Sequence, residues 1–102
     1  MSILHVAIFR WNDGVTDEQI DAFTDALIAL RTKMPMLLSY RFGRDLGLRD
    51  GNFAYGVVAE LESADMVDLY LDHELHQEFV RDFVVHMVAE RRAVQIENVA
   101  GR

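Results

Sequence analysis

The N-terminal part of the chain changes from a two-residue hydrophobic period to a helical one. Alternation over residues 3–11 predicts a strand. Thr16, followed by Gln19 three positions later, has the form of a capping box and marks the start of a helix that should end before Pro35. The expected inner face of the strand carries Ile3, His5, Ala7, Phe9 and Trp11. The expected apolar stripe of the helix consists of Ile20, Phe23, Leu27, Leu30 and Met34.

The rest of the chain predicts two further strands, a second helical region and a last strand. Alternation indicates strands over residues 37–44 and 53–61, joined by a turn-rich loop. Ser63 is expected to cap the second helical region, whose apolar pattern continues to Val88. Residues 72–76 interrupt this pattern, which favours two helices or one bent helix. Residues 93–99 are expected to form the last strand.

This order of elements, β-α-β-β-α-β, is typical of a ferredoxin-like α+β fold with an antiparallel sheet and helices on one face. Residues 1–102 are therefore expected to form a single domain. The first and third strands are apolar on both faces, so one apolar face would remain uncovered. That face would carry Leu4, Val6, Ile8, Ala54 and Val58. Packing of two such sheets face to face predicts a homodimer with an inter-subunit barrel.

Composition narrows the class of partner. A chain of 102 residues with a formal net charge of −7 and Lys33 as its one lysine has no basic patch for a phosphate backbone or an anionic membrane. Neither nucleic acid nor membrane is therefore expected as a partner. The sequence contains no cysteine. It shows no signal peptide and no membrane-spanning stretch, so we expect a cytoplasmic protein.

Histidines and a tyrosine are the candidates for chemistry. His5 is either a half-buried histidine bonded to backbone or water, or an acid-base group in a pocket wall. Tyr70, His73 and His76 follow one another at spacings of three, on roughly one side of a regular helix. His73 is expected to cap a helix, and His86 to lie on a helix surface or at an interface. No metal site is predicted, because there is neither a His-Glu-x-x-His motif nor a cysteine ligand.

Three stretches carry a family resemblance. They are His5–Trp11, Gly43–Asp45 and the Tyr-x-x-His-x-x-His segment that ends at His76. Together they resemble the stress-responsive A/B barrel (Dabb) family over nearly the whole chain. The resemblance implies a dimeric α+β barrel, in agreement with the two-faced strands, but it does not imply one activity.

The resemblance also suggests roles for single residues. One plant member is a polyketide cyclase that performs an intramolecular aldol condensation. Its catalytic strand histidine matches His5, its principal catalytic histidine matches His76, and a tyrosine of its pocket matches Tyr70. The cyclase has a tyrosine where this chain has Leu27 and a histidine where it has Tyr55, so a different substrate is expected. A histidine with the ordinary pKa of about 6.5 is mostly neutral at pH 7, so His76 needs no special tuning to act as a base.

The leading hypothesis is a small-molecule pocket in each subunit, with proton transfer next to a carbonyl and no cofactor. His76 would be the base, Tyr70 would orient the substrate or that base, and His5 would donate to the developing oxyanion. Substrate contacts are expected from Tyr55, Ala7, Phe9, Val57 and Leu27. One alternative is a non-enzymatic stress-associated or assembly protein. A second, by analogy of fold alone, is a cofactor-poor monooxygenase.

Overall fold

The computed structural model describes residues 1–101 and contains one four-stranded antiparallel sheet. Its strands lie in the order β2-β3-β1-β4. The first and third strands, β1 (Ile3–Trp11) and β3 (Tyr55–Leu61), are central, and both neighbours of β1 run antiparallel to it. The edges are β2 (Ser39–Arg44) and β4 (Val88–Glu97). This is the predicted ferredoxin-like fold.

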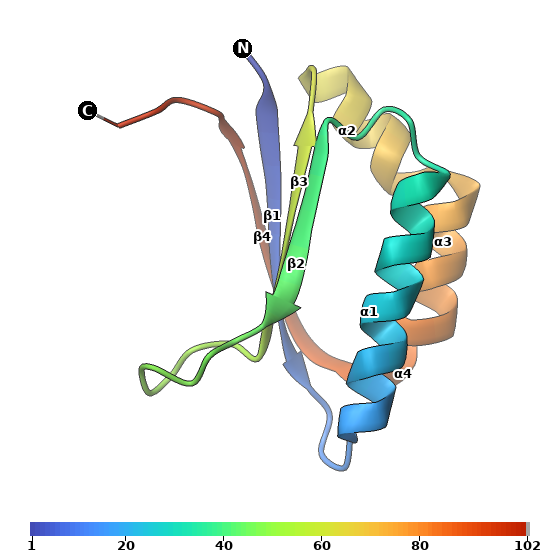
Figure 1. Cartoon of the computed structure of the whole chain (residues 1–102), viewed down its shortest axis with the longest axis vertical. Coiled ribbons are helices and arrows are strands. Elements are labelled where there is room, and N and C mark those ends of the chain that lie inside the picture. The colour runs from blue at the N-terminus through green and yellow to red at the C-terminus, as the bar shows by residue number, and fades with distance from the viewer. Residues whose placement is uncertain (102) are drawn as a thin grey trace.

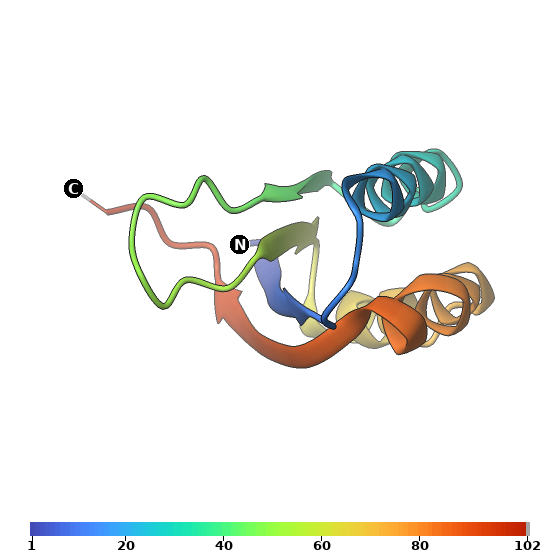
Figure 2. The ribbon, with the colours of Figure 1, turned by 90° about the horizontal axis from the view of Figure 1, so that it is seen from below.

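Helices cover one face of the sheet (Figures 1 and 2). They are α1 (Asp17–Thr32), α2 (Ala64–Leu71), α3 (Glu74–Phe79) and the short α4 (Val85–Met87), with a π-helical turn over Val80–Val84. The other face bears no helix, and the β2–β3 loop and the chain after β4 project away from the helical layer (Figure 1). Within residues 1–101, none of these helices is both long and apolar enough to cross a bilayer.

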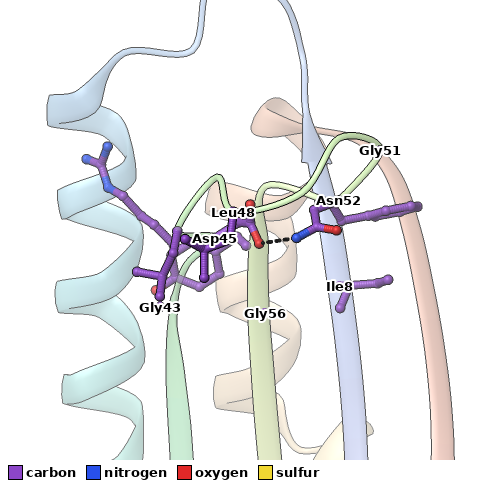
Figure 3. Close-up of a pocket in the computed structure, with 11 residues that line it drawn as sticks. Ile8, Gly43, Asp45, Leu48, Gly51, Asn52 and Gly56 are labelled. Atoms are coloured by element: carbon purple, nitrogen blue, oxygen red, sulfur yellow. Dashed lines mark hydrogen bonds between the residues drawn. The ribbon is translucent and has the colours of Figure 1, made fainter.

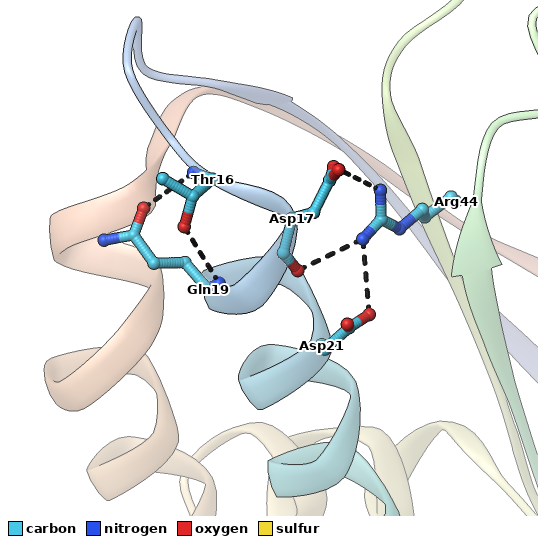
Figure 4. A network of polar contacts seen from close by, with 5 residues as sticks. All are labelled: Thr16, Asp17, Gln19, Asp21 and Arg44. Carbon is cyan, nitrogen blue, oxygen red and sulfur yellow. Dashed lines mark hydrogen bonds and ion pairs between the residues drawn. The ribbon is translucent and has the colours of Figure 1, made fainter.

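The start of α1 is fixed by polar contacts (Figure 4). The Thr16 side chain accepts from the backbone N–H of Gln19, and the Gln19 side chain accepts from the backbone N–H of Thr16. These two bonds form the predicted capping box. Arg44, at the end of β2, donates to carboxylate oxygens of Asp17 at 2.9 Å and of Asp21 at 3.2 Å. These contacts join the first turns of α1 to the edge strand.

The core lies between the helices and the inner face of the sheet. The five apolar residues of the predicted stripe are all buried. Four of them lie in α1, and Met34 follows the end of the helix at Thr32. They meet inward-facing residues of the central strands, including Ala7, Phe9, Val57, Ala59 and Leu61. Phe23 of α1 packs its ring edge-on against those of Phe9, Tyr55 and Phe79.

Several predicted boundaries need correction. The last strand begins at Val88 and not at Ala93, because Val88 already has an extended backbone and pairs with Trp11. Val88 continues the helical spacing of the apolar residues before it, so the sequence pattern did not indicate that the strand begins there. The second and third strands begin two residues later than predicted, at Ser39 and Tyr55. Ser63 occupies the N-cap of α2, but its side chain makes no capping hydrogen bond.

The face of the sheet opposite the helices carries an apolar patch on β1 and β4. Val94 and Ile96 of β4 are 52% and 46% exposed, and Ile8 of β1 is 36% exposed. Val6 lies directly opposite Val94 in the strand register. The structure thus contains the uncovered apolar face that the sequence predicted.

Candidate functional site

A cavity of about 230 Å³ lies between the inner face of the sheet and the helices α1 and α3. Seven of the predicted site residues line it: His5, Ala7, Phe9, Leu27, Val57, Tyr70 and His76. Five further residues complete its wall: Tyr40, Phe79, Val80, Val84 and Arg91. Most of this wall is apolar, and its polar groups come from β1, β2, β4, α2 and α3.

His5 is held by a cross-strand neighbour. It is 3% exposed and lies opposite Gln95 of β4 in the register. The Gln95 side-chain nitrogen lies 2.8 Å from His5 Nδ1, and an amide nitrogen can only donate. Nδ1 therefore accepts, and the neutral ring carries its hydrogen on Nε2. Burial, followed by the charge of Arg91, lowers the pKa of His5, which keeps the ring neutral at pH 7.

His76 owes its orientation to the break between α2 and α3. Because α2 ends at Leu71, the carbonyl of Leu71 is available to side chains and accepts from Gln77 at 2.7 Å. His76 Nδ1 lies 3.1 Å from the same oxygen. A carbonyl oxygen can only accept, so Nδ1 carries the hydrogen and Nε2 holds the lone pair. The two histidines thus have opposite tautomers.

Burial also changes the acidity of His76. Desolvation lowers its pKa from 6.5 to about 4, although the Leu71 hydrogen bond opposes this change. The expectation that His76 keeps an ordinary pKa is therefore wrong. Its imidazole is neutral over the whole physiological pH range, but it is a weaker base than an exposed histidine.

Tyr70 lies beside both histidines. Its ring centroid is 4.7 Å from that of His76 and 6.1 Å from that of His5, with edge-on geometry in both pairs. Its hydroxyl lies 2.5 Å from the hydroxyl of Tyr40, a residue of β2. Burial raises the pKa of Tyr70 to about 12, and burial also raises the pKa of Tyr40. Both phenols are therefore hydrogen-bond donors at neutral pH.

Tyr55 does not line this cavity, contrary to the predicted pocket. It lies opposite Phe9 and Arg44 in the strand register, two residues nearer the β2–β3 loop than Val57. Its hydroxyl lies 2.6 Å from Oγ1 of Thr24 on α1, and its ring packs against Phe23 at 5.0 Å. The phenol is thus satisfied within the core at the other end of the sheet.

The two remaining histidines lie outside the cavity. Nδ1 of His73 accepts from the backbone N–H of Leu75 at 3.1 Å, so His73 caps α3 as predicted. His86 is exposed in α4, and its backbone carbonyl accepts from the side chain of Asn12. Among residues 1–101, no group of three or more histidine or acidic side chains is placed to hold a metal ion.

Sequence reasoning missed Tyr40 and Arg91 as cavity residues. Tyr40 lies opposite Ala59 in the register, so it shares the inner face with that residue. Arg91 lies opposite Phe9 and shares the same face, but the last strand was expected to start two residues later. Alternation counted back from Ala93, which lies opposite Ala7, places Arg91 on the inner face, whereas the register shift beside Trp11 breaks the alternation between Val88 and Arg91. The π-helical turn that places Val80 and Val84 in the wall had no signal in the sequence.

A second, shallower hollow of about 600 Å³ lies at the other end of the sheet, beneath the β2–β3 loop (Figure 3). Ile8 and Gly56 line it from the open face, together with the loop residues Asp45, Leu48 and Asn52. Asn52 donates to Asp45 at 3.0 Å, which holds the loop together. Leu48 and its neighbour Leu46 are 75% and 82% exposed. This hollow is therefore continuous with the uncovered apolar face.

Comparison with known proteins places the fold within one family. The model of the stress responsive A/B barrel domain matches residues 3–98. No curated protein matches the chain. A dimeric ferredoxin-like protein of unknown function from Thermobifida fusca is 43% identical, with a TM-score of 0.86 over 94% of this chain and 90% of that one.

More distant solved structures share the fold alone. A Dabb family protein from Mesorhizobium loti is 17% identical, with a TM-score of 0.81 over 97% of this chain and 98% of the other. The hydroxynitrile lyase from Passiflora edulis is also 17% identical, with a TM-score of 0.82 over 98% of this chain and 97% of the lyase.

Proposed function

The chain belongs to the stress responsive A/B barrel domain family, and from this premise we propose that its cavity binds a small carbonyl compound and transfers a proton at the carbon next to the carbonyl. The observation that carries the proposal is the pair of opposite tautomers. His76 offers a lone pair on Nε2, and His5 offers a hydrogen on Nε2, in one cavity. A base and an oxyanion donor are the two groups that enolisation needs.

In the proposed step, Nε2 of His76 removes the proton from the carbon next to the carbonyl. The electron pair of the broken C–H bond moves to the carbonyl oxygen, which becomes an enolate oxygen. His5 donates its Nε2–H to that oxygen. A base whose pKa is only about 4 needs such a donor, since it cannot remove a weakly acidic proton unless the resulting charge is stabilised. Return of the proton from His76 to carbon would complete an exchange or isomerisation. Attack of the enolate carbon on a second carbonyl, whose oxygen then takes the proton from His76, would complete an aldol-type cyclisation.

Tyr70 supports the same step from its place between the histidines. The Tyr70 hydroxyl lies 2.5 Å from that of Tyr40, and each phenol can donate one hydrogen. When Tyr40 donates to Tyr70, the hydrogen of the Tyr70 hydroxyl is available to a ligand. We assign Tyr70 the role of orienting the carbonyl.

We also propose that two copies of the chain pair through the face of the sheet that lacks helices. The 43% identical protein from Thermobifida fusca is described as dimeric. In this chain the exposed side chains of Ile8, Val94 and Ile96 lie together on that face. Burial of apolar side chains is the main driving force for such an association. The cavities lie on the opposite side of each sheet, so pairing would leave them accessible.

The test of proton transfer does not require the natural substrate. Two simple ketones, 4-oxopentanoate and 4-acetylbenzoate, are incubated with the protein in D₂O, and loss of the signals of the protons next to the ketone is followed by proton NMR. We expect exchange above the buffer rate. His76→Gln should reduce the enzymatic part of the rate by ~10²-fold or more, as expected for the loss of a positioned base.

The matched control is His86→Gln, which changes an exposed histidine outside the cavity and should exchange at the wild-type rate. Equal exchange by the His76→Gln protein would show that His76 is not the base. A wild-type rate equal to that of buffer with both ketones would overturn the proposed proton transfer and favour a binding or assembly role.

A further inference from the structure

The cavity contains a permanent charge that the proton-transfer step does not use. Among the described residues that line it, Arg91 alone is permanently charged, and none is acidic. Arg91 lies opposite Phe9 in the register of β1 and β4, which places it on the helix-covered face. Arg91 lines the cavity and is an exposed residue, so it lies where the cavity meets solvent.

Arg91 also differs from its neighbours in having no ion-pair partner within residues 1–101. Arg10 and Arg92, which lie on the other face of the sheet, both pair with Glu90, at 3.1 Å and 2.6 Å. The charge of Arg91 is nonetheless felt inside the cavity, because it lowers the pKa of His5, Tyr70 and His76.

We propose that the substrate carries a carboxylate as well as a carbonyl, and that Arg91 binds the carboxylate at the cavity mouth while the carbonyl lies between Tyr70 and the two histidines. The planar guanidinium matches a carboxylate with two parallel hydrogen bonds. A monoanion also balances the single positive charge. A phosphate dianion would leave excess negative charge beside the apolar side chains of Phe9, Val80 and Val84.

The size of the cavity limits the ligand. An apolar cavity of about 150 Å³ holds one benzene molecule, so 230 Å³ accommodates one ring, or a chain of similar volume, with its carboxylate at the mouth. We therefore infer that the substrate class is small oxo acids. This inference rests on the proposed function for the position of the carbonyl, but the role of Arg91 is measured by binding and not by proton exchange.

The experiment compares each acid with its neutral amide of nearly the same shape. Isothermal titration calorimetry measures the binding of 4-oxopentanoate against 4-oxopentanamide, and of 4-acetylbenzoate against 4-acetylbenzamide. We expect the wild-type protein to bind each acid about tenfold more tightly than its amide, as is typical of a charge-assisted hydrogen bond. Arg91→Gln should abolish this preference, and Arg91→Lys should retain part of it.

The matched control is Arg92→Gln, which removes a neighbouring arginine from the opposite face of the sheet and should keep the full preference. Circular dichroism of each variant verifies that it is folded. Binding of acids and amides with equal affinity would overturn the role of Arg91 and leave the carbonyl pocket intact. A preference for acids without proton exchange would support the role of Arg91 and contradict the proton transfer. Absence of binding by all four compounds would overturn both.

Discussion

Neighbours, and not differences in charge, give His5 and His76 their separate roles. Both rings are neutral, and each is fixed by one hydrogen bond to Nδ1. The amide nitrogen of Gln95 makes His5 a donor through Nε2, whereas the carbonyl oxygen of Leu71 makes His76 an acceptor through Nε2. A substitution at Gln95 or a movement of the α2–α3 break would therefore alter the chemistry without changing either histidine.

The low pKa of His76 predicts a specific pH dependence of stability. Its pKa is about 4 in the folded protein and about 6.5 when unfolded. Between these values the unfolded chain binds a proton that the folded protein does not, so acidification favours unfolding. His76 should thus leave stability unaffected above pH 6.5 and lower it progressively as the pH falls from 6.5 to 4. The maximum loss is about 3 kcal/mol, from about 1.4 kcal/mol per pKa unit.

Urea unfolding of the wild type and of His76→Gln over this pH range measures the effect. Carboxylates titrate in both proteins, so the difference between the two profiles isolates the histidine. We expect the free energy of unfolding of the variant to fall less steeply between pH 6.5 and 4. Parallel profiles would mean that His76 titrates alike in the folded and unfolded chains, contrary to its burial in the cavity wall.

At the scale of single elements, the helix starts are not equally well fixed. Both side-chain bonds of the capping box are present at α1, whereas Ser63 makes no such bond at α2. Thr16→Ala should therefore lower the free energy of unfolding by about 1 kcal/mol, the usual cost of losing an N-cap. Ser63→Ala is the matched control and should change it by less than about 0.5 kcal/mol. Urea unfolding at pH 7 measures both, and equal losses would contradict the difference in capping.

Elements with a strong local signal were predictable from the sequence. Alternation identified β1, and the capping box and apolar stripe identified α1, since these signals depend on neighbouring residues only. The change from helix to strand at Val88 was not predictable in this way. The helical spacing of apolar residues continues through Val88, but this segment pairs with β1. The pairing with β1, and not the local pattern, makes it a strand. The late predicted start of β4 is also why Arg91 was missed.

The candidate site was predictable in its residue types but not in its chemistry. His5, Tyr70 and His76 were identified from strand position, helical spacing and family resemblance, and the structure places all three in one cavity wall. Their tautomers depend on Gln95 and Leu71, partners that only the strand register and the helix break bring close. Tyr55 was misplaced because its pocket role came from the family resemblance, which does not show that Thr24 across the core binds the hydroxyl.

At the scale of the whole molecule, the sheet separates two tasks. Its helix-covered face forms the cavity, with the polar groups that could act on a ligand. Its open face carries an apolar patch on β1 and β4, and the β2–β3 loop projects from that side (Figure 1). Because successive residues of a strand point to opposite faces, β1 contributes His5 to the cavity and Val6 to the open face. Changes on one face therefore leave the side chains of the other in place.

This separation predicts that pairing can be abolished while the cavity is kept. Val94 lies on the open face and is 52% exposed in the single chain. Val94→Glu would place a carboxylate in the proposed interface, where it would be desolvated without a partner. Native mass spectrometry should give twice the mass of one chain for the wild type and the mass of one chain for the variant. Ligand binding measured by calorimetry should persist in the variant.

The matched control is Ile28→Glu, which introduces the same charge at an equally exposed apolar residue of α1, on the helix side of the molecule. This protein should remain a dimer. A wild-type monomer would contradict the proposed pairing, because the apolar face would then be tolerated in water. A Val94→Glu protein that still pairs would place the interface elsewhere. Pairing lost together with ligand binding would show that the two faces are coupled through the sheet, and that the cavity is complete only in the dimer.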